Sequence, residues 1–281
     1  MPLLPQQIAP VDERQAALTD GCLSGHTGAL MDYFLALRAE TDAALAPRLG
    51  AAAGKPYPYG RCAEINSDLF TRLARRVKEP ATDVDRTLRD FVSQGGIVRT
   101  VWGVLRGQYF QNAIQFGGLY VDVSNDTVVL TKPKVEILPI AESGLVPVRD
   151  LAHFRATAES YWGAAIYANH LVPSLAPLLP MISASPGRLR PGMQSACDYM
   201  IALMCLDGFR QAEDWLRDGP APPAEIASAV LASVPPDLRA RTADGRAESL
   251  EACRWARASG CDRDQGWRDV RVKEYLRTVR A

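Results

Sequence analysis

One long stretch of the chain has the pattern of β-structure, and most of the remainder has the pattern of helices. From residue 97 to residue 138, Val, Ile, Leu, Phe, Tyr and Trp dominate, and short Gly-containing breaks divide the run. These residue types favour strands, and the breaks favour tight turns. The pattern predicts strands over 97–105, 108–116, 119–123, 127–131 and 135–138. Because short turns join consecutive strands, we expect an antiparallel meander.

The turn at residues 117–118 is expected to fix the register of the central hairpin. Gly-Gly is typical of a two-residue hairpin turn. With that turn, Ile114 lies opposite Val121 and the apolar side chains share one face. Asp122 then lies on the opposite face from Asn112. A three-residue turn would instead pair Asn112 with Asp122 directly.

Apolar residues recur at helical spacing on both sides of this stretch. Helices are predicted near 12–18, at 27–46, from Cys62 onwards, and at 82–93, 149–166, 193–206, 209–217, 223–233, 246–258 and 265–278, with short turns over the Pro-rich stretch 173–191. The predicted fold class is therefore α+β, a small antiparallel β-meander with a packed N-terminal helix, followed by a mostly helical C-terminal region. The expected domains are a helical segment at 1–50, an α+β core at 51–147 and a helical domain or layer at 148–281.

Composition and charge narrow the classes of function. The formal net charge of the 281 residues is zero, so we expect no broad electrostatic footprint for nucleic acid. No run approaches the roughly 18 apolar residues that a membrane span needs, so we expect no membrane partner. The six cysteines are scattered without a CxxC pair, and the chain has three histidines. Free thiols, a cytoplasmic location, no metal site and no cofactor are expected.

Cys62 is the best candidate nucleophile. It falls in the first turn of a predicted helix whose buried stripe is Ile65, Leu69 and Leu73. The partial positive charge of a helix N-terminus favours the thiolate form, and Arg61 adds to it. The alternative is a small buried residue that fills space, which cysteines often are.

The order of three short motifs suggests a family. Gly-Arg-Cys stands at residues 60–62, Asn-Ala at 112–113 and Tyr-Val-Asp at 120–122. This order resembles the transglutaminase-like branch of papain-like cysteine enzymes, in which Gly-x-Cys opens a helix, His-Ala begins a strand, and Trp-Val-x-Val-Asp ends a strand. The resemblance covers residues 56–127. Asn112 stands where the family has histidine.

The resemblance implies a catalytic set of Cys62, Asn112 and Asp122, which would act on an amide, peptide or thioester. In such triads the histidine accepts the thiol proton and later donates it, and the aspartate orients the ring. Asparagine does not titrate near neutral pH, so it only orients or donates a hydrogen bond. The alternative is a non-catalytic member of the fold that binds a peptide, protein or small ligand, in a bacterial biosynthetic or secretion pathway.

A set of polar and aromatic residues around the predicted sheet is the candidate substrate-binding surface. Its members are Tyr57, Tyr59, Trp102, Gln111, Gln115, Asn125 and Asp126. Apolar walls with a few polar groups are typical of a pocket for a small molecule or peptide, which is the expected partner. The alternative is an exposed sheet face with turn-forming Asn and Asp.

Overall fold

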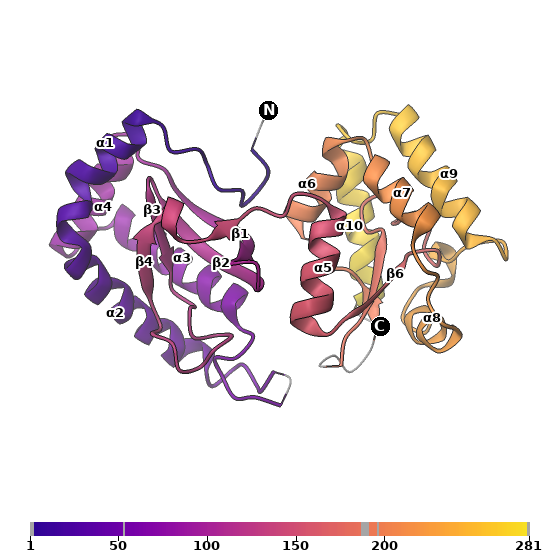
Figure 1. Cartoon of the computed structure of the whole chain (residues 1–281), viewed down its shortest axis with the longest axis horizontal. Helices are drawn as coiled ribbons and strands as arrows, with labels where there is room; N and C mark the ends of the chain where they lie inside the picture. Colours follow the sequence, from indigo (N-terminus) through magenta and orange to yellow (C-terminus); the bar gives the residue numbers. More distant parts are fainter. Residues whose placement is uncertain (1–2, 53, 187–190, 196, 280–281) are drawn as a thin grey trace. The chain divides into compact units, whose positions relative to one another are not determined.

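The computed structural model describes residues 3–52, 54–186, 191–195 and 197–279. The chain divides into two compact units: unit 1 spans Gln6–Pro147, and unit 2 spans residues 148–279 together with residues 3–5. Helices and antiparallel strands are both present (Figure 1), so the predicted α+β class is confirmed.

Unit 1 contains a five-stranded antiparallel sheet with the strand order β4-β3-β2-β1-β5. The strands are β1 (Val98–Leu105), β2 (Tyr109–Phe116), β3 (Leu119–Asp122), β4 (Glu136–Pro139) and β5 (Leu145–Val146). Gly117, with a φ of +53°, occupies the left-handed region that its turn requires. Ile114 pairs with Val121. The predicted two-residue turn and its register are therefore confirmed.

The predicted strand at 127–131 is wrong, because this segment forms turns. The backbone N–H and the hydroxyl of Thr127 both donate to the carbonyl of Ser124, at 3.0 and 2.7 Å. Such local bonds compete with strand pairing. The fifth place in the sheet is taken by β5 instead, which lies beside β1. A Cβ added at Gly103 would come within 2.2 Å of the Val146 carbonyl oxygen, so this close approach requires glycine.

Helices of unit 1 pack on one face of this sheet (Figure 1). They are α1 (Glu13–Cys22), α2 (Thr27–Leu45), α3 (Cys62–Lys78) and α4 (Asp83–Ser93), with a 3₁₀ turn η1 (Ser24–His26). The core combines apolar side chains of α2 (Leu30, Phe34, Leu37), α3 (Ile65, Leu69, Leu73) and the sheet (Ile114, Phe116, Val121). This packing holds the start of α3 against β2, which positions the candidate site.

Unit 2 combines helices with a three-stranded antiparallel sheet of order β6-β7-β8. The helices are α5 (Leu151–Trp162), α6 (Asp198–Leu206), α7 (Arg210–Asp218), α8 (Ala224–Leu231), α9 (Gly245–Ala258) and α10 (Gln265–Val279). The strands are β6 (Ala165–Ala168), β7 (Met181–Ala184) and β8 (Gly192–Met193). Short 3₁₀ turns η2 (Ile140–Glu142) and η3 (Pro236–Leu238) lie in unit 1 and unit 2, respectively.

Two predicted helices of unit 2 are shorter than the sequence pattern indicated. The helix predicted to reach residue 166 ends at Trp162, because Gly163 adopts a left-handed C-cap with a φ of +58°. The helix predicted from Met193 begins at Asp198, and Met193 belongs to β8. In both cases some of the lost residues belong to short strands that the sequence pattern did not indicate: Ala165 and Ile166 to β6, and Met193 to β8.

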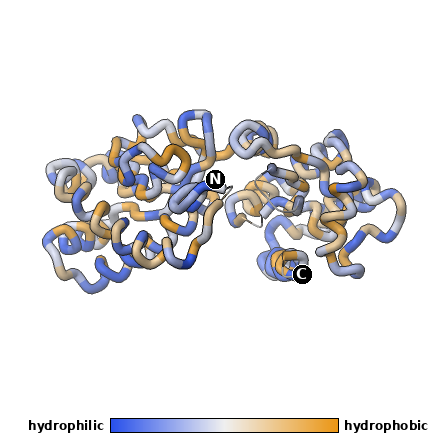
Figure 2. Tube along the Cα trace, turned by 90° about the horizontal axis from the view of Figure 1, so that it is seen from below, coloured by the Kyte–Doolittle hydropathy of each residue, from blue (hydrophilic) through white to orange (hydrophobic). Residues whose placement is uncertain are grey.

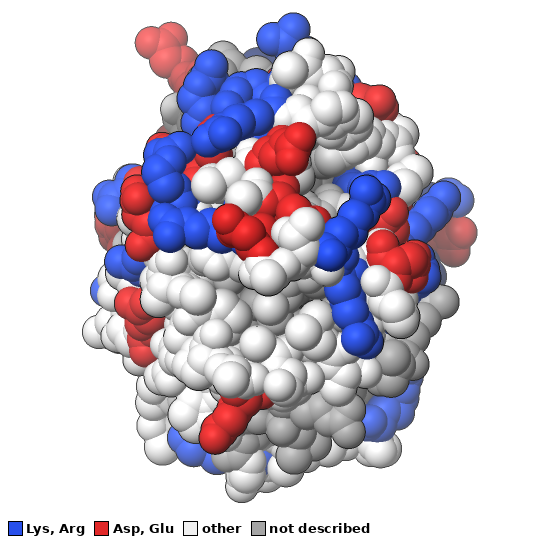
Figure 3. Space-filling model, turned by 90° about the vertical axis from the view of Figure 1, so that its right-hand side faces the viewer, with Lys and Arg blue, Asp and Glu red and all other residues white. Residues whose placement is uncertain are grey.

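Hydrophobic and hydrophilic stretches alternate along the chain in both units (Figure 2). Among the residues described, none of the helices combines the length and the hydrophobicity that a bilayer crossing requires. On the face drawn in Figure 3, cationic and anionic side chains are interspersed rather than separated by sign. This mixture accords with the formal net charge of zero.

Candidate functional site

The structure brings together the first two residues of the implied catalytic set. Cys62 is the first residue of α3, and Asn112 lies on β2. The amide Nδ2 of Asn112 donates to Cys62 Sγ at 3.5 Å. Both residues are half-buried. The apolar stripe of α3 packs on the face of the sheet that carries Asn112, and this packing accounts for the contact.

The environment of Cys62 favours the neutral thiol. Burial raises its pKa, and the hydrogen bond from Asn112 opposes this effect without cancelling it. The charges of Asp122 and Glu64 raise the pKa further. The guanidinium of Arg61 donates to Glu64 at 2.9 Å, so its charge is paired there rather than with the sulfur. Desolvation therefore outweighs the helix N-terminal field that the sequence suggested.

Asp122 is fully buried on the face of the sheet opposite to Asn112, as the two-residue turn predicted. Its carboxylate accepts hydrogen bonds from Gln111 Nε2 at 2.7 Å, Tyr120 Oη at 3.0 Å and the Ser124 backbone N–H at 2.7 Å. Burial raises the pKa of Asp122 to about 6, although each of these donors lowers it.

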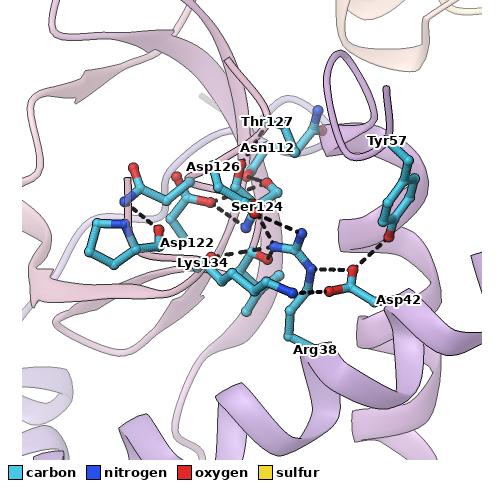
Figure 4. A network of polar contacts seen from close by, with 12 residues as sticks. Arg38, Asp42, Tyr57, Asn112, Asp122, Ser124, Asp126, Thr127 and Lys134 are labelled. Carbon is cyan, nitrogen blue, oxygen red and sulfur yellow. Dashed lines mark hydrogen bonds and ion pairs between the residues drawn. The ribbon is translucent and has the colours of Figure 1, made fainter. Parts of the chain in front are cut away.

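Asn112 and Asp122 are joined only indirectly within the described residues. The hydroxyl of Ser124 lies 3.3 Å from the Asn112 carbonyl oxygen and 3.1 Å from Asp122 Oδ1 (Figure 4). On β2 it is Gln111, the neighbour of Asn112, whose side chain donates to Asp122. Cys62, Asn112 and Asp122 are therefore neighbours, but their side chains do not form a continuous hydrogen-bonded chain.

His153 and His170 have partners other than Cys62. His170 Nε2 lies 2.8 Å from the Leu216 carbonyl oxygen, and His153 Nδ1 accepts from the Arg149 backbone N–H at 3.3 Å. Burial lowers the pKa of both rings. In the part of the chain that the structure describes, no imidazole is hydrogen-bonded to Cys62, and no cluster of three His, Cys, Asp or Glu could hold a metal ion.

The residues predicted to bind substrate are mostly engaged in internal contacts. The Gln115 amide, fully buried, exchanges hydrogen bonds with the backbone of Ala9 at 2.8 and 2.9 Å. Trp102 stacks on Phe110 with ring centroids 5.2 Å apart. Lys55 lies 4.2 Å from the ring centroid of Tyr59.

The remaining predicted residues also have partners within unit 1. Asn125 Nδ2 donates to the Pro133 carbonyl at 3.0 Å. Tyr57 donates to Asp42 at 2.6 Å, and Asp126 is paired with Arg38. The structure thus assigns most of the predicted binding surface to packing and to loop anchoring.

Arg38 is the organising residue that the sequence pattern missed (Figure 4). Its side chain, fully buried, donates to Asp42 at 2.7 Å, to Asp126 at 2.8 and 3.2 Å, and to the Val123 carbonyl at 2.7 Å. Burial alone would lower its pKa, and the two carboxylates more than offset that effect. Lys134 also pairs with Asp42. The network ties α2 to the turns that follow β3.

A sequence signal for Arg38 did exist. Arg38 follows the apolar Phe34 by four residues and precedes Asp42 by four, so it lies in line with both on its helix. An arginine inside an apolar stripe, with a carboxylate one turn away, indicates a buried ion pair. Asp126, its second partner, is 88 residues away and carries no such local signal.

Unit 2 contains a cavity of about 660 Å³ between η3, α9 and α10. Its size falls within the range of about 300–1,000 Å³ that is usual for small-molecule sites. Charged side chains and the exposed indole of Trp255 line it. The sequence pattern identified none of the residues that line this cavity as a candidate functional residue.

Comparison with known proteins yields no relative: no protein-family model, no curated protein and no solved structure matches the chain.

Proposed function

We propose that this chain is a non-catalytic binding protein for a small molecule or peptide, built in part on a core that resembles the transglutaminase-like fold. The observation that carries the proposal is the environment of Cys62. Its hydrogen-bond partner is the amide of Asn112 rather than a base, and burial raises its pKa.

Acyl transfer by a cysteine needs a group that accepts the thiol proton and returns it to the leaving group. The Asn112 amide occupies the position of such a group and donates a hydrogen bond to the sulfur. It does not accept the thiol proton, because an amide is not a base near neutral pH. Asp122 does titrate, but its carboxylate contacts Gln111 and Ser124 on the other face of the sheet. These contacts support binding or scaffolding rather than turnover.

A cysteine-dependent acyl-transfer enzyme is the second candidate. It is favoured by one observation, that Cys62 opens α3 and lies 3.5 Å from an amide N–H, the kind of donor that also stabilises an oxyanion. On this alternative, Asn112 would stabilise charge on the substrate, the thiol proton would pass to solvent, and solvent would protonate the leaving group.

The rate of thiol alkylation separates the two candidates. We expect iodoacetamide to label Cys62 in the full chain slowly at pH 7, with a rate that rises only above the ordinary thiol pKa of about 8.5. Peptide mapping by mass spectrometry assigns the label to each of the six cysteines. Cys62→Ser identifies the signal from this position, and Cys22, which is also half-buried, serves as the matched reference.

Labelling of Cys62 at neutral pH that is faster than at the other five positions would refute the non-catalytic proposal. It would favour the acyl-transfer enzyme, which a stable acyl adduct on Cys62 after exposure to p-nitrophenyl acetate would then establish. Equal or slower labelling supports the binding protein.

A further inference from the structure

The cavity of unit 2 has walls that carry both signs of charge. The lining includes three arginines (Arg239, Arg241, Arg271) and four carboxylates (Asp237, Glu248, Glu251, Glu274). Apolar surface is contributed by Pro173, Leu238, Ala252 and Trp255. An excess of one carboxylate makes the wall unsuited to a strongly anionic ligand such as a nucleotide, because phosphate sites concentrate cations.

Three of these seven charges form ion pairs within unit 2, and Arg239 donates to the Val234 and Leu231 carbonyl oxygens, each at 2.9 Å. Arg277 donates two hydrogen bonds of 2.9 Å to Asp237, which fixes η3 to α10. Arg271 donates to Glu274 at 2.7 Å along α10. These pairs shape the wall and leave little capacity for a ligand.

In the described part of unit 2, Glu248 does not pair with another wall charge through a hydrogen bond but instead holds the loop that carries Arg241. Its carboxylate accepts from the backbone N–H groups of Arg241 and Thr242 at 3.0 and 2.6 Å, and from the Thr242 hydroxyl at 2.7 Å. These bonds, together with the nearby charge of Arg241, hold the pKa of Glu248 below its usual value. The loop is thereby attached to α9, and the base of the Arg241 side chain has a defined position at the cavity.

Two charges of opposite sign are left for a ligand. Within the described residues, the guanidinium of Arg241 and the carboxylate of Glu251 form no hydrogen bond or ion pair, although both side chains line the cavity. Trp255 follows Glu251 by one turn on the same face of α9, and 57% of its surface is exposed. A cation, an anion and a flat apolar surface are thus available in one cavity.

We propose that this cavity binds a short peptide with free termini, whose carboxylate pairs with Arg241 and whose ammonium group pairs with Glu251. An apolar side chain of the peptide packs on Trp255. Arg241 offers the planar fork that carboxylates prefer, and an indole beside a carboxylate suits an ammonium group through cation–π attraction. The inference rests on the proposed binding function and names its site and ligand class.

Calorimetric titration of the full chain with three forms of one dipeptide tests the proposal. The probes are Ala-Phe with free termini, its N-acetyl form and its C-terminal amide. We expect saturable binding of the free dipeptide with a Kd near or below about 1 mM. Each blocked form should bind about tenfold more weakly, because each loses one charge-assisted contact.

Two variants assign each contact to one side chain. The Arg241→Gln variant should bind the C-terminal amide of the dipeptide as tightly as it binds the dipeptide with free termini. The Glu251→Gln variant should bind the N-acetyl form as tightly as it binds the dipeptide with free termini. Arg246→Gln on α9 and Glu225→Gln on α8, both exposed and outside the cavity lining, should leave the affinities unchanged. Thermal unfolding checks that each variant is folded, and Arg241→Ala and Glu251→Ala replace any variant that is not.

The inference is overturned if no probe binds saturably, if all three bind equally, or if the two variants behave like the controls. Tighter binding of inorganic phosphate than of the dipeptide would also overturn it. Fast labelling of Cys62 would refute the non-catalytic proposal while leaving the peptide site intact. An inert Cys62 without dipeptide binding would remove this inference alone.

Discussion

At the scale of single residues, Arg38→Ala is the substitution in unit 1 that we expect to cost the most stability. Arg38→Ala would leave Asp126, which is 4% exposed, buried without its cation. Breaking a buried ion pair from one side costs about 3–5 kcal/mol of stability. Urea unfolding followed by circular dichroism measures this loss. Arg86→Ala, in an exposed pair with Asp83, should cost no more than about 1 kcal/mol. Equal effects of the two substitutions would contradict the assignment.

The carboxyl group of Asp122 makes the folding stability of unit 1 depend on pH. Its folded pKa of about 6 lies above the ordinary value of about 3.9, so the folded protein binds this proton more tightly than the unfolded chain does. The stability that Asp122 contributes is therefore fully present below about pH 4 and decreases as the pH rises to about 6. The total decrease is about 3 kcal/mol.

Comparison of wild type with Asp122→Asn isolates this contribution. We expect the stability of wild type relative to the variant to fall between pH 4 and pH 7, whereas the carboxylates of Asp42 and Asp85, with lowered pKa values, affect both proteins alike. Unfolding free energies across this range provide the measurement. A difference that is constant with pH would show that the carboxyl titrates normally.

The sequence predicted the residue-scale contacts that depend on local periodicity. The two-residue turn at residues 117–118 placed Asn112 and Asp122 on opposite faces, as observed. The pairing of Arg38 with Asp126 could not be predicted in this way, because it joins positions that only the folded core brings together.

At the scale of elements, the close approach of β5 to β1 depends on one glycine. A Cβ at Gly103 would meet the Val146 carbonyl oxygen at 2.2 Å, so Gly103→Ala must displace β5. We expect a loss of about 1–3 kcal/mol, as for other overpacked positions. Gly28→Ala is the control, because a Cβ there meets nothing within 4 Å and helices favour alanine. Equal unfolding midpoints for the two variants would contradict this account of β5.

Strands and helices were predicted best where the pattern is long. The helices α2, α3 and α4 and the strands β1 and β2 extend over enough residues for their period to be clear. The strand β6 has only four residues, Ala165–Ala168, and it follows a helix whose composition it shares. The segment at 127–131 has strand-like residues, but the hydrogen bonds of Thr127 and the ion pair of Asp126 hold it in turns.

At the scale of the whole molecule, each unit has its own core. The buried apolar side chains of the central core of unit 1 come from residues 23–135, and none of the described residues of unit 2 belongs to this core. A unit that buries its apolar surface internally is expected to fold by itself. We therefore predict that a fragment of residues 6–147 unfolds in one cooperative thermal transition, as followed by far-ultraviolet circular dichroism.

The Arg38 network supplies the control for this fragment, because all its members lie in unit 1. If the fragment is natively folded, Arg38→Ala should lower its stability by about the same amount as in the full chain, since distant sites contribute additively. A fragment without a cooperative transition, or one insensitive to Arg38→Ala, would mean that unit 1 needs unit 2 to fold.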